Sequence, residues 1–286
     1  MVGADFGDQK LDGVFINTIM SDRKSERVYF ENADGIRLAG ILDYNQAGNR
    51  AFALFSHCFT CNKDLKAIVK ISRRLAEHGI AVLRFDFEGL GDSKGSFSDS
   101  NLETNLRDVR AAVGFLAAHH EPPQLLIGHS LGGSAMLTLA EEVDSARALV
   151  TIASPSTTEH LIKHLSSESP AIVSEGEGEV VIGGRTWLIK KQFLENLAQY
   201  DLNQSLKELT KPHFIIHPST DETLAYWHAE KMFELTGGPK SVLTLDESDH
   251  LLVVRADDAV YVANMIASWV ERYLARSCST FARASD

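Results

Sequence analysis

The chain has 286 residues, of which 44% are hydrophobic and 23% charged, and its net charge is −11 at pH 7. This length is enough for one large core with an inserted segment. An acidic chain without basic clusters argues against nucleic acid or an anionic membrane as a partner. No apolar run approaches the roughly 20 residues of a membrane-spanning helix, and the N-terminus does not resemble a signal peptide. The three cysteines do not form a disulfide framework and favour a reducing cytoplasm.

The first half of the chain predicts strands and helices in alternation. Residues 1–25 are polar and are expected to form a loosely attached lead-in. Two strands, 27–30 and 36–42, surround the turn at Asp34-Gly35. After them we expect a buried strand at 51–55, an amphipathic helix at 64–78, a strand at 81–85 and a helix at 101–119.

The second half continues the same pattern after a break. A strand at 124–127 leads into a helix that runs to about residue 140, and a buried strand follows at 148–153. Strands at 213–217 and 241–245 and a closing helix at 257–275 complete the series. This order predicts an α/β fold, a mostly parallel sheet with helices on both faces. We expect the core to comprise residues 26–154 and 206–276, with a flexible tail at 277–286.

Residues 155–205 interrupt the alternation. Two β-prone runs, 180–182 and 185–189, are joined by Gly183-Gly184, which is a strong hairpin signal. Residues 190–200 then read as a helix. The segment is therefore predicted to be a small lid, made of a hairpin and a helix, on the side where the loop of Ser130 emerges.

The motif Gly128-His129-Ser130-Leu131-Gly132 lies between a predicted buried strand and a predicted helix. This context is typical of a nucleophile elbow, a sharp turn that exposes a serine hydroxyl. Glycines at both ends would avoid side-chain clashes with the adjacent strand and helix. The N–H of Leu131, at the start of a helix, would point to where an oxyanion could form. Ser130 is the predicted nucleophile.

A serine nucleophile needs a base and an acid that holds the base in one tautomer. His250 fits the base because it follows the last predicted strand, although His57 and His217 also end strands. Asp221 fits the acid because it follows the strand between the elbow and His250. Its rivals are Glu222, Asp246 and Asp249.

The loop after residue 55 should supply a second oxyanion donor, for which the N–H of Phe59 is the candidate. Cys58 and, in the lid, Trp187 are expected to line the substrate pocket. The spacing Cys58-x-x-Cys61 also permits a redox or zinc site, but a zinc site needs further ligands at paired spacing. We expect two small buried side chains that line the catalytic loop, with no metal and no cofactor.

The elbow and the order Ser130, Asp221, His250 resemble the α/β-hydrolase superfamily over residues 27–275. Residues 86–93 resemble its Asp-x-x-Gly-x-Gly-x-Ser turn. More narrowly, residues 56–64, 217–224 and 248–252 resemble bacterial hydrolases that are often fused to an osmotically inducible protein C domain, and no such second domain is expected here. One departure is Cys58, since glycine usually follows the histidine at this place in the wider family.

This resemblance and the residues together predict a cytoplasmic serine hydrolase that cleaves short-chain carboxylic esters through an acyl-enzyme. An amidase, peptidase, thioesterase or acyltransferase would use the same residues, and a binding protein with an inactive triad is the non-enzymatic alternative. The expected partner is a small acyl ester. The sequence leaves the oligomeric state open.

Overall fold

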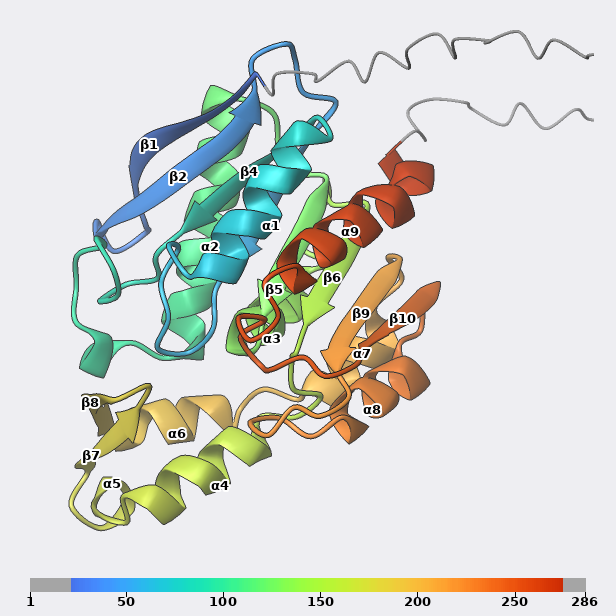
Figure 1. Cartoon of the computed structure of the whole chain (residues 1–286). Coiled ribbons are helices and arrows are strands. Elements are labelled where there is room, and N and C mark those ends of the chain that lie inside the picture. Colours follow the sequence, from blue (N-terminus) through green and yellow to red (C-terminus); the bar gives the residue numbers. More distant parts are fainter. Residues whose placement is uncertain (1–21, 275–286) are drawn as a thin grey trace, which may run out of the picture.

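The computed structural model describes residues 22–274, so the predicted tail at 277–286 and most of the lead-in lie outside the described residues. A mixed eight-stranded sheet has the order β1-β2-β4-β3-β5-β6-β9-β10 (Figure 1). Only β2 runs against its neighbours, which confirms the predicted α/β fold. The strands are β1 (Arg23–Glu31), β2 (Arg37–Asn45), β3 (Ala51–Ser56), β4 (Ile80–Phe85), β5 (Leu125–His129), β6 (Ala148–Ile152), β9 (His213–Pro218) and β10 (Lys240–Leu245).

Helices cover both faces of this sheet, and each face has its own hydrophobic core. The core beneath α1 and α9 includes Ala53 and Phe55 of β3, whereas Leu54 points into the core on the other face. This alternation explains why β3 is apolar along its length. The helices that pack on the sheet are α1 (Lys66–Glu77), α2 (Leu102–His119), α3 (Leu131–Leu139), α7 (Leu202–Glu208), α8 (Trp227–Leu235) and α9 (Asp258–Leu274). No helix within residues 22–274 is long and apolar enough to cross a bilayer.

The segment between β6 and α7 lies beyond one end of the sheet (Figure 1). β7 (Glu177–Ile182) and β8 (Arg185–Lys190) form the hairpin, and the glycines at 183 and 184 both have positive φ, as a two-residue turn of this kind requires. The helix α6 (Lys191–Leu197) follows. Two further helices, α4 (Glu159–Glu168) and α5 (Ala171–Ser174), were not predicted. Only Leu165 of α4 is fully buried, so the helix has little apolar pattern to detect.

Two other elements differ from the sequence expectations. β1 begins at Arg23, inside the predicted lead-in, because pairing with β2 forms the strand while its residues up to Arg27 stay largely exposed. α8 was not predicted either. Its buried residues are His228, Ala229 and Met232, which is too short a set for a clear amphipathic pattern.

Arg84 is a charged side chain inside the sheet, and it is 1% exposed. Its Nε donates to Asp43 Oδ2 at 2.8 Å, which joins β4 to β2. Its Nη1 donates to the Lys63 carbonyl and to Asp64 Oδ1, both at 2.8 Å. Arg84 therefore connects the antiparallel part of the sheet to the loop that leads from β3 into α1.

We expect Arg84→Met to lower the free energy of unfolding by about 3–5 kcal/mol, because Asp43 would remain fully buried without its main partner. Urea denaturation measures this change. Arg110→Met is the matched control, since Arg110 pairs with Glu142 at an exposed site, where such pairs contribute at most about 1 kcal/mol. Equal effects of the two substitutions would contradict this account of Arg84.

Candidate active site

The carboxyl ends of four strands meet at one edge of the sheet, where ligands of open parallel sheets bind. Phe59 follows β3, Ser130 follows β5, Asp221 follows β9 and His250 follows β10. A cavity of about 1080 Å³ opens at this edge, and Phe59, Ser130 and His250 line it. The segment between β6 and α7 supplies the opposite wall. Elements far apart in the sequence thus converge on one cavity.

Ser130 has the strained backbone of a nucleophile elbow, with φ 54° and ψ −124°. A Cβ on Gly128 would lie 2.4 Å from the Gly133 Cα, and one on Gly132 would lie 2.4 Å from the His57 carbonyl oxygen. Both glycines are therefore required by close backbone contacts rather than by positive φ. The Ser130 N–H donates to the Ile152 carbonyl at 2.9 Å, which fixes the turn against β6.

His250 and Asp221 are hydrogen-bonded to each other. The distance from His250 Nδ1 to Asp221 Oδ2 is 2.7 Å, and the His250 side chain is 10% exposed. A carboxylate can only accept, so Nδ1 carries the proton and leaves Nε2 as the unprotonated nitrogen. This tautomer is the one that a general base beside Ser130 needs.

Asp221 is held as a carboxylate. Burial alone would raise its pKa, but the hydrogen bond from His250, the charge of that ring and two backbone N–H groups lower it. Those N–H groups belong to Thr223 and Leu224, which lie 2.9 and 2.8 Å from Asp221 Oδ1. The Asp221 carboxylate is therefore ionised and oriented at neutral pH.

Two of the three rival acids are engaged elsewhere. Asp249 accepts the N–H groups of Leu251, Val253 and Val254 and so shapes the loop after His250. Asp246 accepts from Ser219, and Glu222 is exposed at the cavity. Of the four candidates, Asp221 is the one hydrogen-bonded to His250.

Three other histidines near the site are buried and connect loops. His57 Nδ1 donates to the Cys58 carbonyl at 2.8 Å, and its Nε2 accepts the Phe87 N–H at 3.2 Å. His217 Nε2 donates to the Leu224 carbonyl at 2.8 Å, which braces the turn of Asp221. His129 Nε2 donates to the His250 carbonyl at 2.8 Å. The sequence had offered His57 and His217 as alternative bases, but both have their ring nitrogens directed into the protein.

The backbone N–H groups of Leu131 and Phe59 are suitable oxyanion donors. Both residues line the cavity with Ser130, and within residues 22–274 neither N–H has a hydrogen-bond acceptor. The Phe59 ring is held between Phe97 and Phe193, with centroid distances of 5.4 and 4.9 Å. Packing on both sides fixes the orientation of Phe59, the candidate for the second donor.

Trp187 extends this aromatic cluster into the hairpin. Its ring lies 4.7 Å from that of Phe97, and its Nε1 donates to the Ile182 carbonyl at 3.3 Å. Trp187 and Cys58 both line the cavity. The hairpin is thereby joined through aromatic contacts to the loop after β3.

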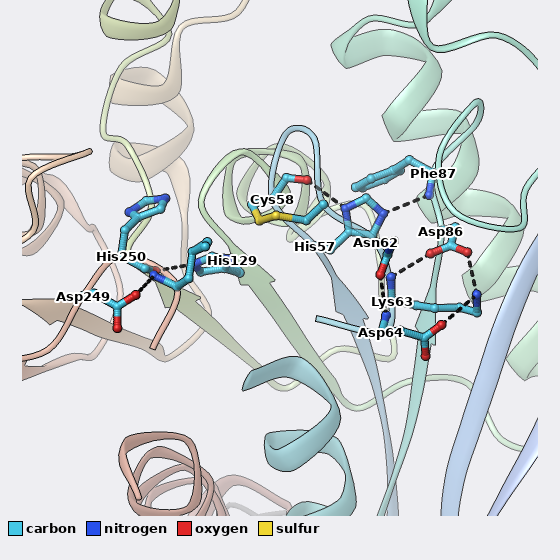
Figure 2. Close-up of a disulfide and its surroundings, with 12 residues drawn as sticks. His57, Cys58, Asn62, Lys63, Asp64, Asp86, Phe87, His129, Asp249 and His250 are labelled. Atoms are coloured by element: carbon cyan, nitrogen blue, oxygen red, sulfur yellow. Dashed lines mark hydrogen bonds and ion pairs between the residues drawn. A yellow bond between two sulfur atoms is a disulfide. The ribbon is translucent and has the colours of Figure 1, made fainter. Parts of the chain in front are cut away.

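Cys58 and Cys61 form a disulfide, which corrects the expectation of two unlinked side chains (Figure 2). The residues from 58 to 61 make a turn in which the Cys61 N–H donates to the Cys58 carbonyl at 3.2 Å. That turn brings the two Cα atoms to 5.2 Å, within the usual range for a disulfide. Because the sulfurs are bonded to each other, they are not available as zinc thiolates.

Lys63 is a residue of this loop that the sequence did not single out. It is 2% exposed, and its Nζ lies 2.7 Å from both Asp86 Oδ2 and Asp92 Oδ2. Figure 2 shows the contact with Asp86. The Lys63 backbone N–H donates to Asp86 Oδ1 at 2.6 Å. A lysine in a polar stretch is usually exposed, so the residues around Lys63 do not predict its burial. The carboxylate in the 86–93 turn is the feature of the sequence that could have suggested a partner for it.

Comparisons with known proteins identify relatives of the chain by family, fold and sequence. A family model described as "Alpha/beta hydrolase family" matches residues 51–280. The esterase domain of a Rhodothermus marinus protein is 41% identical in sequence, with a TM-score of 0.72 over 88% of this chain and 99% of that domain. Est1E from Butyrivibrio proteoclasticus, solved with ferulic acid, shares the fold with 22% identity and a TM-score of 0.71, over 87% of this chain and all of that chain.

Two curated proteins are also similar. Rat mitochondrial palmitoyl-protein thioesterase ABHD10 is 26% identical over 219 residues, which is 73% of this chain and 72% of the rat protein. The uncharacterized protein YfhR of Escherichia coli K12 is 25% identical over 237 residues, which is 79% of this chain and 74% of that protein.

Acid should weaken the fold through His129. Burial, helped by the charge of His250, lowers the pKa of His129 to about 3. The ring thus stays neutral when folded, whereas in the unfolded chain it binds a proton below about pH 6.5. Its contribution to stability is complete above that pH and is lost as the pH falls toward 3. Urea denaturation should show that wild type loses roughly 2 kcal/mol more than His129→Gln between pH 7 and pH 5. Equal losses would refute this.

Proposed function

Because the chain belongs to the α/β hydrolase family, we propose that it cleaves short-chain carboxylic esters through an acyl-enzyme on Ser130. An esterase-like hydrolase is the coarser assignment that the family and the structural neighbours support. The single observation that carries the finer proposal is the 2.7 Å contact between His250 and Asp221, beside a cavity that Ser130 also lines.

Each residue has one role in the proposed reaction. His250 Nε2 accepts the hydroxyl proton while Ser130 Oγ attacks the ester carbonyl, and Asp221 stabilises the imidazolium that forms. The N–H groups of Leu131 and Phe59 donate to the oxyanion of the tetrahedral intermediate. His250 then protonates the leaving alcohol, which leaves an acyl group on Ser130. Water, deprotonated by His250, releases the acid and restores the serine.

The lining of the cavity supports a short acyl group. The inserted segment contributes the apolar side chains of Leu161, Val181, Ile182 and Trp187, but it also contributes exposed ionisable ones. Those on its side of the cavity are His160, His164, Glu168 and Arg185. A long acyl chain laid against them would strip water from charged groups without replacing their hydrogen bonds, which is costly.

Thioester hydrolysis is the second candidate. It requires the same nucleophile, base and oxyanion donors, with a thiol in place of the alcohol as leaving group. The observation that favours it is the similarity to the rat palmitoyl-protein thioesterase. Matched oxygen and sulfur esters of the same acyl group, assayed side by side, discriminate between the two.

We expect Ser130→Ala to abolish turnover and Asp221→Asn to lower kcat about 10⁴-fold, since the amide would leave His250 in the wrong tautomer. Hydrolysis of p-nitrophenyl acetate gives both rates. Ser130→Ala should melt within a few degrees of wild type, because one hydroxyl contributes little stability.

Asp246→Asn is the matched control for the acid, since Asp246 follows β10 and contacts Ser219 rather than His250. It should retain near wild-type kcat. Normal turnover by Ser130→Ala would overturn the proposed nucleophile, and a larger loss in Asp246→Asn than in Asp221→Asn would reassign the acid.

The role of the hairpin in acyl-chain preference can be tested with the substitution Trp187→Ala. If Trp187 roofs the acyl site, its removal enlarges the cavity, so the ratio of kcat/KM for octanoyl over acetyl esters should rise by about an order of magnitude. Leu188→Ala, a half-exposed neighbour absent from the cavity lining, is the control. An unchanged chain-length profile would mean that the hairpin does not touch the acyl group.

A further inference from the structure

The disulfide between Cys58 and Cys61 encloses only two residues, and one of them is Phe59. The same four-residue turn is closed by the hydrogen bond from the Cys61 N–H to the Cys58 carbonyl. The covalent bond therefore constrains the backbone that carries the second oxyanion donor. The proposed reaction makes no chemical use of either sulfur.

The two cysteines differ in accessibility. Cys58 is 5% exposed, whereas Cys61 is partly exposed. Cys61 lines the large cavity together with Ser130, and it also lines a smaller polar cavity of about 290 Å³ with Asn62, Asp92 and Arg185. Cys58 also lines the large cavity, but it is the more buried residue of the two, so an external thiolate is expected to attack the Cys61 sulfur.

We propose that Cys58 and Cys61 form a reversible thiol–disulfide switch of hydrolysis, in which a dithiol reduces the pair and the reduced enzyme turns over more slowly. This inference rests on the proposed function, because the switch acts through the Phe59 N–H. The inference goes beyond that function because it identifies a site of redox modification and names the class of its co-reactant, a dithiol.

The exchange proceeds in two steps. A thiolate of the dithiol attacks the Cys61 sulfur, the bond between the cysteines breaks, and Cys58 leaves as a thiolate that takes a proton from solvent. The second thiol of the reductant loses its proton and attacks the mixed disulfide, which releases Cys61. Two electrons and two protons pass to the pair, and the reductant becomes a disulfide. A disulfide oxidant reverses both steps.

We expect reduction to change the conformation of the turn from Cys58 to Cys61 without moving the residues on either side of it. Once unbonded, the two sulfurs must move apart to van der Waals contact, and the turn is then closed by one backbone hydrogen bond of 3.2 Å. The His57 contact with the Cys58 carbonyl and the packing of the Phe59 ring remain, so the backbone of the turn is loosened rather than released. On either side, His57 stays bonded to the Phe87 N–H and Lys63 stays bonded to Asp86. The movement is thereby confined to the residues around Phe59, so the fold should survive.

The expected consequence is a loss of kcat at nearly constant KM. Oxyanion donors are effective because they are fixed before the charge develops, and removing one costs about 10²–10³ in kcat. A donor that is loosened rather than removed should cost less, so we expect a decrease of about 10- to 100-fold. KM should change little, since the donor acts mainly on the charged intermediate.

The test uses the full chain with Cys278→Ser, which leaves Cys58 and Cys61 as the only cysteines. The enzyme is equilibrated in mixtures of reduced and oxidised dithiothreitol, its thiols are counted by alkylation and mass, and kcat and KM are measured with p-nitrophenyl acetate. We expect kcat to follow the fraction of disulfide and to recover on reoxidation, with both forms folded by circular dichroism.

The control is the same protein with Cys58→Ser and Cys61→Ser, which should have the low kcat of the reduced enzyme at every ratio. Equal kcat for the fully reduced and fully oxidised enzyme would overturn the switch, as would a reduced enzyme that unfolds at the assay temperature. A redox response in the double variant would also overturn it. Failure of the proposed function is distinguishable, because it would leave Ser130→Ala active.

Discussion

The geometry of the site depends on a buried ion pair between Lys63 and Asp86. Asp86 is fully buried at the end of β4 and accepts both the backbone N–H and the Nζ of Lys63. Burial alone would lower the pKa of Lys63, but the carboxylates of Asp86 and Asp92 raise it. A charged pair this deep is stable only when its hydrogen bonds are satisfied, as they are here. The loop that carries Phe59 is fixed at its far end by this contact.

This pair also explains Gly91 and Ser93 of the 86–93 turn. A Cβ on Gly91 would lie 2.1 Å from Asp86 Oδ2, so only glycine leaves room for the carboxylate. The Asp92 N–H donates to the same oxygen at 2.8 Å, and Ser93 Oγ donates to the Asp86 carbonyl at 2.6 Å. Within the motif that the family resemblance predicts at residues 86–93, Gly91, Asp92 and Ser93 therefore surround the carboxylate and the carbonyl of Asp86.

The sequence was informative where a candidate residue lies in the loop after a strand. Ser130 directly follows β5, and Asp221 and His250 come three and five residues after the ends of β9 and β10, so the parallel sheet predicts that they lie at one edge. The structure brings His250 and Asp221 into contact, although it leaves their chemical roles to experiment. The catalytic reading of Phe59 likewise stays a prediction, because it depends on a backbone direction rather than a side chain.

The structural features that could not be predicted from the sequence share one physical cause. The α4 helix and the start of β1 bury few residues of their own, and neighbouring chain segments stabilise them. The disulfide requires the turn from Cys58 to Cys61, and spacing alone does not distinguish it from a reduced pair. The burial of Lys63 depends on Asp86, 23 residues away. Each is a tertiary effect that overrides local preference.

The position of the inserted segment has an evolutionary consequence. It leaves the sheet after β6 and rejoins it before β9, and it supplies one wall of the cavity but none of Ser130, Asp221 and His250. Substitutions there can reshape the cavity while Ser130, Asp221 and His250 keep their support from the sheet. The segment contacts the loops of these residues through Phe193 against Phe59 and through the hydrogen bond between His160 and the Thr223 carbonyl. The shape of the cavity can therefore change almost independently of the candidate catalytic residues, provided that these contacts are kept.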